Sequence, residues 1–265
     1  MDRALESTGG GARRAIAWDD LDGAPLGDAG RRVVGASWLE RTRQEHLAVG
    51  AFALLARELA EQGCDALVLS LVTRAACDEV RHAEICRRFA VAMLGADDVP
   101  ARFRGLPGVP MHASAPPPLR VLLHVVEMCC LSETLTGVYF TEMLARTSDP
   151  VARAAVESLL EDEIDHGRVG WAYLAERARE RQVEGLAEAL PAMLDRTFRA
   201  VLAPRRAATA TASDDAALEA CAYLGPRASA DVYRRALRDV IVPGFETLGI
   251  DLAPARARLR ERGWT

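Results

Sequence analysis

Two stretches of the sequence repeat one short pattern, Glu79-Val80-Arg81-His82 and Glu163-Ile164-Asp165-His166. Residues three positions apart lie on one face of an α-helix, so the glutamate and histidine of each stretch can reach the same point. Apolar residues recur every three or four positions on both sides of each stretch, as in helices that bury one face. The pattern therefore predicts two helices that carry pairs of polar side chains into an apolar interior.

The same periodicity predicts four long helices. They are expected over residues 32–62, 65–94, 119–147 and 150–183. Gly63 and Gly95 stand where a residue with positive φ commonly ends a helix, and Asp149-Pro150 has the residue types that begin one. Residues 96–117 are rich in proline and are expected to form an irregular crossover. Two helix pairs joined by one long connection are typical of a four-helix bundle.

The two ends of the chain differ from this central part. Residues 1–30 are rich in glycine and lack periodicity, so we expect a disordered or loosely attached segment. The predicted bundle covers residues 31–183. After it, weaker helical patterns predict a C-terminal helical extension, residues 184–265, that packs on the bundle. Those patterns cover residues 184–203, 214–224 and 228–240. The expected fold is all-α, a four-helix bundle with one long crossover and additional C-terminal helices.

Composition narrows the classes of function. The 265 residues carry a net charge of −5, which gives no basis for a nucleic-acid partner. No run approaches the length of apolar sequence that spans a membrane, so no membrane partner is expected. The first thirty residues lack the apolar run of a secretory signal, and the cysteines form no CxxC pair. We therefore expect a cytoplasmic protein.

Four glutamates occupy the middle of the four predicted apolar faces. Buried carboxylates are costly without partners, and four together would repel one another. Two divalent cations would remove both costs, and oxygen and nitrogen ligands suit iron or manganese. The predicted metal ligands are Glu45, Glu79, His82, Glu133, Glu163 and His166.

One glutamate from each of two helices and a Glu-x-x-His from each of the others resembles the ferritin-like di-iron carboxylate proteins, over about residues 32–183. The resemblance implies two iron ions, or iron with manganese, bridged by Glu79 and Glu163. It implies that Glu45 with His82, and Glu133 with His166, complete the two ions. Dioxygen would be the co-substrate.

The resemblance also implies an enzyme that hydroxylates, desaturates or N-oxygenates a small organic molecule. It implies an external electron donor and is compatible with a homodimer. Thr136 lies one turn after Glu133, where acyl-carrier-protein desaturases carry a threonine, so Thr136 is the candidate catalytic residue. Ordinary helix packing is its other interpretation. Arylamine N-oxygenases have a similar layout but carry a further histidine where this chain has Leu159. Two other functions stay open: iron or peroxide handling, as in ferritin or rubrerythrin, and a metal-free interaction module.

Other polar residues are weaker candidates for metal ligands or other functional groups. The glutamates whose phase departs from the apolar faces are poor candidates for ligands: Glu40, Glu58, Glu127 and Glu142. His46 and His124 are better explained as hydrogen-bonded or solvated histidines. Asp78 and Asp165 either orient the histidines or are surface charges. Cys129 and Cys130 are interpreted as packing residues, with a redox role as the alternative. The small residues expected to line a pocket are Ala48, Ala75, Gly137 and Gly170.

Overall fold

The computed structural model describes residues 15–100, 112–202 and 215–264. Within these ranges every regular element is a helix and no strand occurs, which confirms the predicted all-α class. The elements of the first two thirds of the chain are η1 (Trp18–Asp20), η2 (Ala24–Leu26), α2 (Gly27–Glu61), α3 (Ala66–Leu94), η3 (Ala96–Asp98), α4 (Pro117–Val125), η4 (Val126–Glu133), α5 (Thr134–Arg146) and α6 (Pro150–Arg179).

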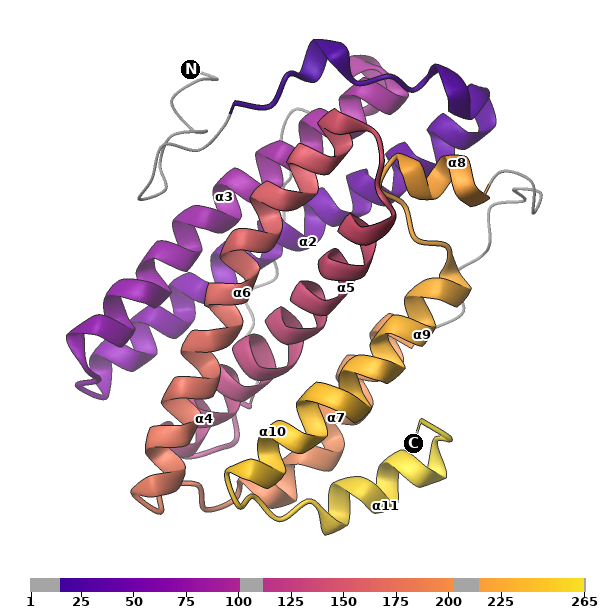
Figure 1. Ribbon diagram of the computed structural model, residues 1–265. Coiled ribbons are helices and arrows are strands. Elements are labelled where there is room, and N and C mark those ends of the chain that lie inside the picture. Colours follow the sequence, from indigo (N-terminus) through magenta and orange to yellow (C-terminus); the bar gives the residue numbers. More distant parts are fainter. Residues whose placement is uncertain (1–14, 101–111, 203–214, 265) are drawn as a thin grey trace.

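Four long helical segments lie side by side (Figure 1). The first two, α2 and α3, pack along most of their length, α3 also contacts α6, and α6 contacts both η4 and α5. The third segment runs without a break from α4 through η4 into α5. Each of the four segments thus brings one side to a shared interior.

The helix ends follow the sequence signals. Gly63 and Gly95 have φ values of +66° and +94°, a region that glycine enters without steric cost. The Asp149 carboxylate caps α6 by accepting hydrogen bonds from the backbone N–H groups of Val151, at 2.9 Å, and Ala152, at 2.7 Å. These features mark the ends of the first and second segments and the beginning of the fourth.

The third segment differs from the uninterrupted helix that the sequence predicts. Residues Val126–Glu133 form a π-helix, with one extra residue in each hydrogen-bonded turn. Its bulge brings Cys129 against α6 at Gly170, where an added Cβ would lie 2.3 Å from the Cys129 side chain. Gly170 therefore permits a close contact between helices, and the expectation that it lines a pocket is wrong.

The segment before α2 is more ordered than the sequence suggests. Ile16 is buried, and the ring of Trp18 meets Phe89 edge-on with centroids 6.4 Å apart. The helix α2 itself begins at Gly27 rather than near residue 32. The expectation of a loose segment is thus wrong for residues 15–30, because apolar side chains anchor them to the core. Residues 1–14 lie outside the described residues.

The C-terminal elements are α7 (Leu186–Leu202), α8 (Asp215–Ala220), α9 (Pro226–Ala236), η5 (Leu237–Ile241), α10 (Val242–Thr247) and α11 (Ala253–Glu261). They lie beside the α5 side of the main body (Figure 1). Contacts join α9 to α5, and α7 to η4 and α11. The sequence pattern located α7, α8 and α9 within a few residues but gave no sign of α10 or α11.

One helical segment, Pro117–Arg146, is long and apolar enough to cross a membrane by length and composition. Within the protein, 72% of its most apolar window is buried against other helices. Burial of this kind is ordinary for a helix at the centre of a packed core.

Candidate metal centre

The six residues predicted as ligands come from all four long segments. Glu45 lies on α2, Glu79 and His82 on α3, Glu133 at the last position of η4, and Glu163 and His166 on α6. All six are buried, with exposures from 0% for His82 to 7% for Glu133. The structure therefore brings every predicted ligand into the interior.

Their oxygen and nitrogen atoms form two groups of the size that holds a metal ion. The first group is Glu45, Glu79, His82 and Glu163, and the second is Glu79, Glu133, Glu163 and His166. Within each group the possible ligand atoms all lie within 4.8 Å of one another. Glu79 and Glu163 belong to both groups, as expected for residues placed between two neighbouring sites.

Both histidines direct Nδ1 toward the shared glutamates. His82 Nδ1 is 3.4 Å from Glu79 Oε2 and 3.3 Å from Glu163 Oε1. His166 Nδ1 is 3.1 Å from Glu79 Oε1 and 3.6 Å from Glu163 Oε2. Each histidine thus contacts the glutamate of the opposite helix as well as its own.

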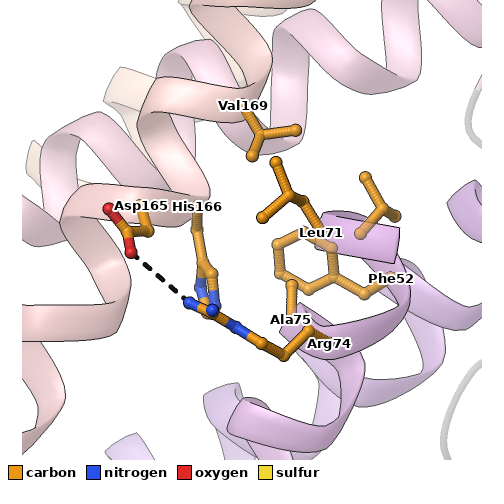
Figure 2. Close-up of a pocket in the computed structure, with 8 residues that line it drawn as sticks. Phe52, Leu71, Arg74, Ala75, Asp165, His166 and Val169 are labelled. Atoms are coloured by element: carbon orange, nitrogen blue, oxygen red, sulfur yellow. Dashed lines mark hydrogen bonds and ion pairs between the residues drawn. The ribbon is translucent and has the colours of Figure 1, made fainter. Parts of the chain in front are cut away.

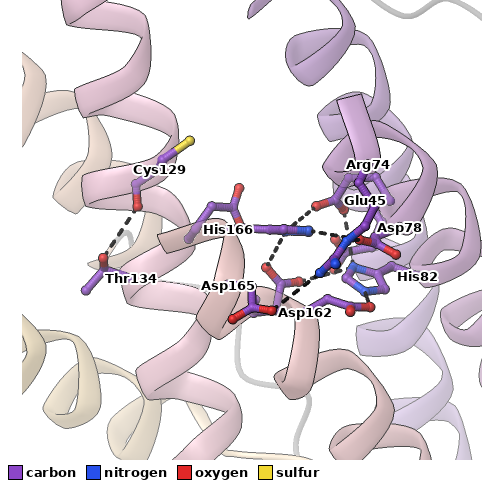
Figure 3. Close-up of polar contacts among 12 residues, drawn as sticks. Glu45, Arg74, Asp78, His82, Cys129, Thr134, Asp162, Asp165 and His166 are labelled. Atoms are coloured by element: carbon purple, nitrogen blue, oxygen red, sulfur yellow. Dashed lines mark hydrogen bonds and ion pairs between the residues drawn. The ribbon is translucent and has the colours of Figure 1, made fainter. Parts of the chain in front are cut away.

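The outer nitrogen of each histidine faces an aspartate of the other helix (Figure 3). His82 Nε2 lies 3.0 Å from Asp162 Oδ2, and His166 Nε2 lies 3.6 Å from Asp78 Oδ2. Arg81 donates to Asp162, and Arg74 lies 3.4 Å from Asp78. An outer carboxylate of this kind fixes the ring orientation of a metal-binding histidine.

These contacts distinguish Asp78 from Asp165, the two aspartates whose roles the sequence did not decide. Asp78 is buried and faces a histidine, whereas Asp165 is partly exposed and pairs with Arg74 and Arg168. Sequence reasoning missed Asp162. The signal was present, because Asp78 precedes Glu79 just as Asp162 precedes Glu163, which extends the repeat to Asp-Glu-x-x-His.

Burial and the charges of neighbouring groups shift the pKa values of the four glutamates of the site, two upward and two downward. Burial, with the nearby charges of Glu79 and Glu163, raises the pKa of Glu45 to about 8, although Arg41 opposes the rise. Burial and Glu163 also raise the pKa of Glu133 well above its usual range. Burial acts upward on Glu79 and Glu163 as well, but their contacts with the two histidines outweigh it and lower both pKa values.

The pKa values of both histidines are raised. Burial lowers the pKa of His82 and His166, but the surrounding carboxylates outweigh burial and raise both pKa values above the usual range. In the metal-free site these shifts favour protons on Glu45, Glu133 and both histidines, and negative charge on Glu79 and Glu163. The charge of the site is balanced by protons that a cation can displace.

The buried atoms that face the middle of the site lack hydrogen-bond partners. Apart from the histidine–glutamate ion-pair contacts described above, both carboxylate oxygens of Glu79 and Glu163, and Nδ1 of His82 and His166, make no hydrogen bond among the described residues, although they are inaccessible to solvent. Buried polar atoms without partners are rare because each costs about 1–3 kcal/mol. Carboxylate and imidazole atoms converging in this way fit one or two divalent cations.

Two other buried glutamates have a different environment. Glu58 accepts a hydrogen bond from Arg120 at 2.9 Å and contacts His124. Glu127 pairs with Arg196 at 2.8 Å and with His112 at 2.6 Å. We call Glu58 and Glu127 the arginine-paired glutamates. Their charges are compensated within the chain, and they belong to neither metal-sized group.

The remaining candidates lie around the site rather than in it. Thr136, half-buried, lies one turn beyond Glu133, and its catalytic role stays a prediction. Cys129 and Cys130 are fully buried, and burial raises the pKa of both thiols, which favours packing over redox chemistry. Glu40 and Glu142 pair with arginines near the surface.

A small apolar pocket lies against the outer side of His166 (Figure 2). Its walls include Phe52, Val72, Ala75 and Val169, and the Arg74–Asp165 ion pair, at 3.4 Å, is part of its lining. Its free volume, about 10 Å³, is close to the minimum that holds one water molecule. Ala75 lines a pocket as expected, but this one is too small for an organic substrate.

No protein-family model, curated protein or solved structure matches this chain. The geometry of the site and the sequence pattern are therefore the grounds on which a function rests.

Proposed function

We propose that this protein is a ferritin-like four-helix-bundle enzyme that binds two iron ions, or iron with manganese, and uses dioxygen to oxidise a small organic molecule. The observation that carries the proposal is the pair of metal-sized groups sharing Glu79 and Glu163, with solvent-inaccessible ligand atoms that have no hydrogen-bond partner. The proposed ligands are Glu45, Glu79, His82, Glu133, Glu163 and His166.

The side chains divide the work of holding the ions. Glu79 and Glu163 would contribute to both metal positions, because each carboxylate belongs to both groups. Asp162 holds the ring of His82 with Nδ1 facing inward, and Asp78 does the same for His166. Glu45 and Glu133 give up their protons when they become ligands.

When bound, the metal pair supplies the electrons that reduce dioxygen and the oxidising power for the organic substrate. The chain contributes a dry interior, since all six ligands are buried. Exclusion of water strengthens the electrostatic interactions there and protects reactive species from side reactions. The proposed reaction would need an external electron donor.

Burial of the four glutamates weighs against a metal-free interaction module, which would need them to face water. The least buried of the four, Glu133, is only 7% exposed. Among the described residues no arginine lies within ion-pair distance of Glu79 or Glu163, so their charge is balanced either by the protons of His82 and His166 or by cations that replace those protons.

Anaerobic reconstitution with ferrous iron tests the proposal. We expect two iron ions per chain, followed by rapid changes in the absorption spectrum and consumption of dioxygen when air is admitted. His82→Ala and Glu163→Ala should lose iron and oxygen reactivity but keep their helix content by circular dichroism. Glu127→Gln is the matched control, because it alters a buried glutamate of the same segment as Glu133 that pairs with Arg196.

Normal iron content and oxygen consumption in both alanine variants would refute the assignment of the site. Iron far above two per chain in a large assembly would instead indicate iron storage, and an unchanged melting temperature at saturating ferrous iron would favour a metal-free scaffold.

A further inference from the structure

The histidines leave one side of the metal site for a substrate. His82 and His166 come from α3 and α6, and their Nδ1 atoms occupy that side of the shared glutamates. The other two predicted ligands, Glu45 and Glu133, come from α2 and from the third segment. A substrate that approached the site from the side of these two glutamates would lie beside α2 and α5.

A partly buried arginine, Arg41, lies beside Glu45. The guanidinium of Arg41, one turn before Glu45 on α2, is 3.3 Å from Glu45 Oε1. It also lies 4.6 Å from the ring centroid of Phe140 and 5.2 Å from that of Tyr139, both on α5. Glu45 is the only acidic side chain that forms an ion pair with Arg41 among the described residues, and the Arg41 side chain is 16% exposed. The guanidinium is thus at the site yet still reachable from solvent.

Space is available next to it. Gly137 is buried on α5, one turn beyond Glu133 and one turn before Phe140. A Cβ added at Gly137 would meet no atom within 4 Å. A buried position with nothing in front of it marks an internal void, in contrast to Gly170, where the equivalent Cβ would collide with Cys129.

We propose that Arg41 binds an anionic group of the substrate, such as a carboxylate, and that the hydrocarbon part of the substrate fills the void at Gly137. This inference rests on the proposed function, because it places a substrate beside the two ions. It names the substrate class as a small organic acid.

Charge balance supports an anion at this point. Glu45 is the acidic partner of Arg41 and is also a proposed metal ligand, so a Glu45 carboxylate that held a metal ion would leave less negative charge for the guanidinium. A buried charge that loses its partner is costly, and a carboxylate can restore the partnership through two parallel hydrogen bonds. The rings of Phe140 and Tyr139 hold the guanidinium by cation–π contact.

Binding of hexanoate to the full-length protein loaded anaerobically with ferrous iron tests the inference by isothermal titration calorimetry. Hexanamide and hexylamine serve as the neutral and cationic compounds of the same chain length. We expect hexanoate to bind at least about 10-fold more tightly than either, as a charge-assisted hydrogen bond predicts.

Two variants locate the interaction. Arg41→Met should weaken hexanoate binding by about 10- to 100-fold, whereas the control Arg43→Met, at an exposed position on the same helix, should not change it. Gly137→Leu fills the void without altering the Arg41–Glu45 pair, so it should also weaken hexanoate binding while iron content stays normal.

Equal binding of hexanoate and hexanamide, or unchanged hexanoate binding in Arg41→Met, would overturn the inference while the proposed function stands if iron and oxygen reactivity are normal. If Arg41→Met fails to load iron, Gly137→Leu decides, and unchanged hexanoate binding there is the overturning result. Failure of the wild-type protein to bind iron would end both proposals.

Discussion

The interior holds two sets of buried glutamates with opposite environments. The arginine-paired glutamates, Glu58 and Glu127, have Arg120 and Arg196 as counter-ions. The shared glutamates of the metal site, Glu79 and Glu163, have no arginine within ion-pair distance among the described residues and rely on His82 and His166. Both sets are nearly inaccessible to solvent, so burial alone does not identify a metal site. The counter-charge separates the two environments.

Neutral substitutions at the two kinds of site should have opposite consequences, and this is the largest effect we expect. Glu133→Gln replaces a carboxyl group whose pKa is raised by burial and by Glu163, so the metal-free protein should lose little stability. The same variant should fail to bind two metal ions. Glu58→Gln should bind metal normally but lose about 1–3 kcal/mol of stability, because Arg120 and His124 lose their carboxylate partner.

Urea unfolding of the metal-free proteins and metal analysis of the loaded proteins measure the two quantities. If Glu58→Gln lost metal while Glu133→Gln kept it, the distinction between the two environments would be wrong.

The pH dependence of stability should reverse when metal binds. Glu45 has a pKa of about 8 in the folded protein, so between its ordinary value near 4.5 and pH 8 the folded chain retains a proton that the unfolded chain has lost. The raised pKa values of the histidines act in the same direction above pH 6.5. Stability of the metal-free protein should therefore fall as pH rises through this window. Glu79 and Glu163, with lowered pKa values, act oppositely but only at more acidic pH.

Metal binding displaces those protons, so metal affinity should increase as pH rises through the same window. Melting temperatures from about pH 6 to about pH 8, with chelator and with excess zinc, provide the comparison. Parallel pH profiles in the two conditions would show that the glutamates and histidines of the site do not exchange protons for metal.

A smaller effect should distinguish two aspartates of α6. Asp162→Asn weakens the hold on His82 and should reduce metal affinity by about 10- to 100-fold. Asp165→Asn alters a partly exposed carboxylate that pairs with Arg74 and Arg168, and should leave affinity unchanged. Competition with a chromophoric chelator measures both. Equal affinities in the two variants would remove the orienting role of Asp162.

The sequence was informative where local spacing determines position. The Glu-x-x-His repeat and the apolar faces predicted all six residues that gather in the centre, because residues three or four apart share one side of a helix. Gly63, Gly95 and Asp149 marked helix ends through local backbone chemistry. These signals need no knowledge of distant parts of the chain.

Features that depend on distant partners were not predictable in this way. The arginine that compensates Glu127 is Arg196, on α7, and no spacing rule links them. The sequence predicts one helix over residues 119–147, and no spacing rule distinguishes the π-helical part, Val126–Glu133, within it. Ile16, which is buried, and Trp18, which packs partly buried against the core, lie in a glycine-rich stretch that has no periodic signal.

The exchange of aspartates between α3 and α6 makes neither helix self-sufficient. Each helix supplies a glutamate and a histidine, but the aspartate that orients each imidazole ring belongs to the other helix. A fragment ending before α6 would retain Glu79-Val80-Arg81-His82 and still lack the brace for that ring. Tight metal binding would therefore indicate that the two halves of the chain have packed in the native register, and a misfolded population would bind metal ions weakly.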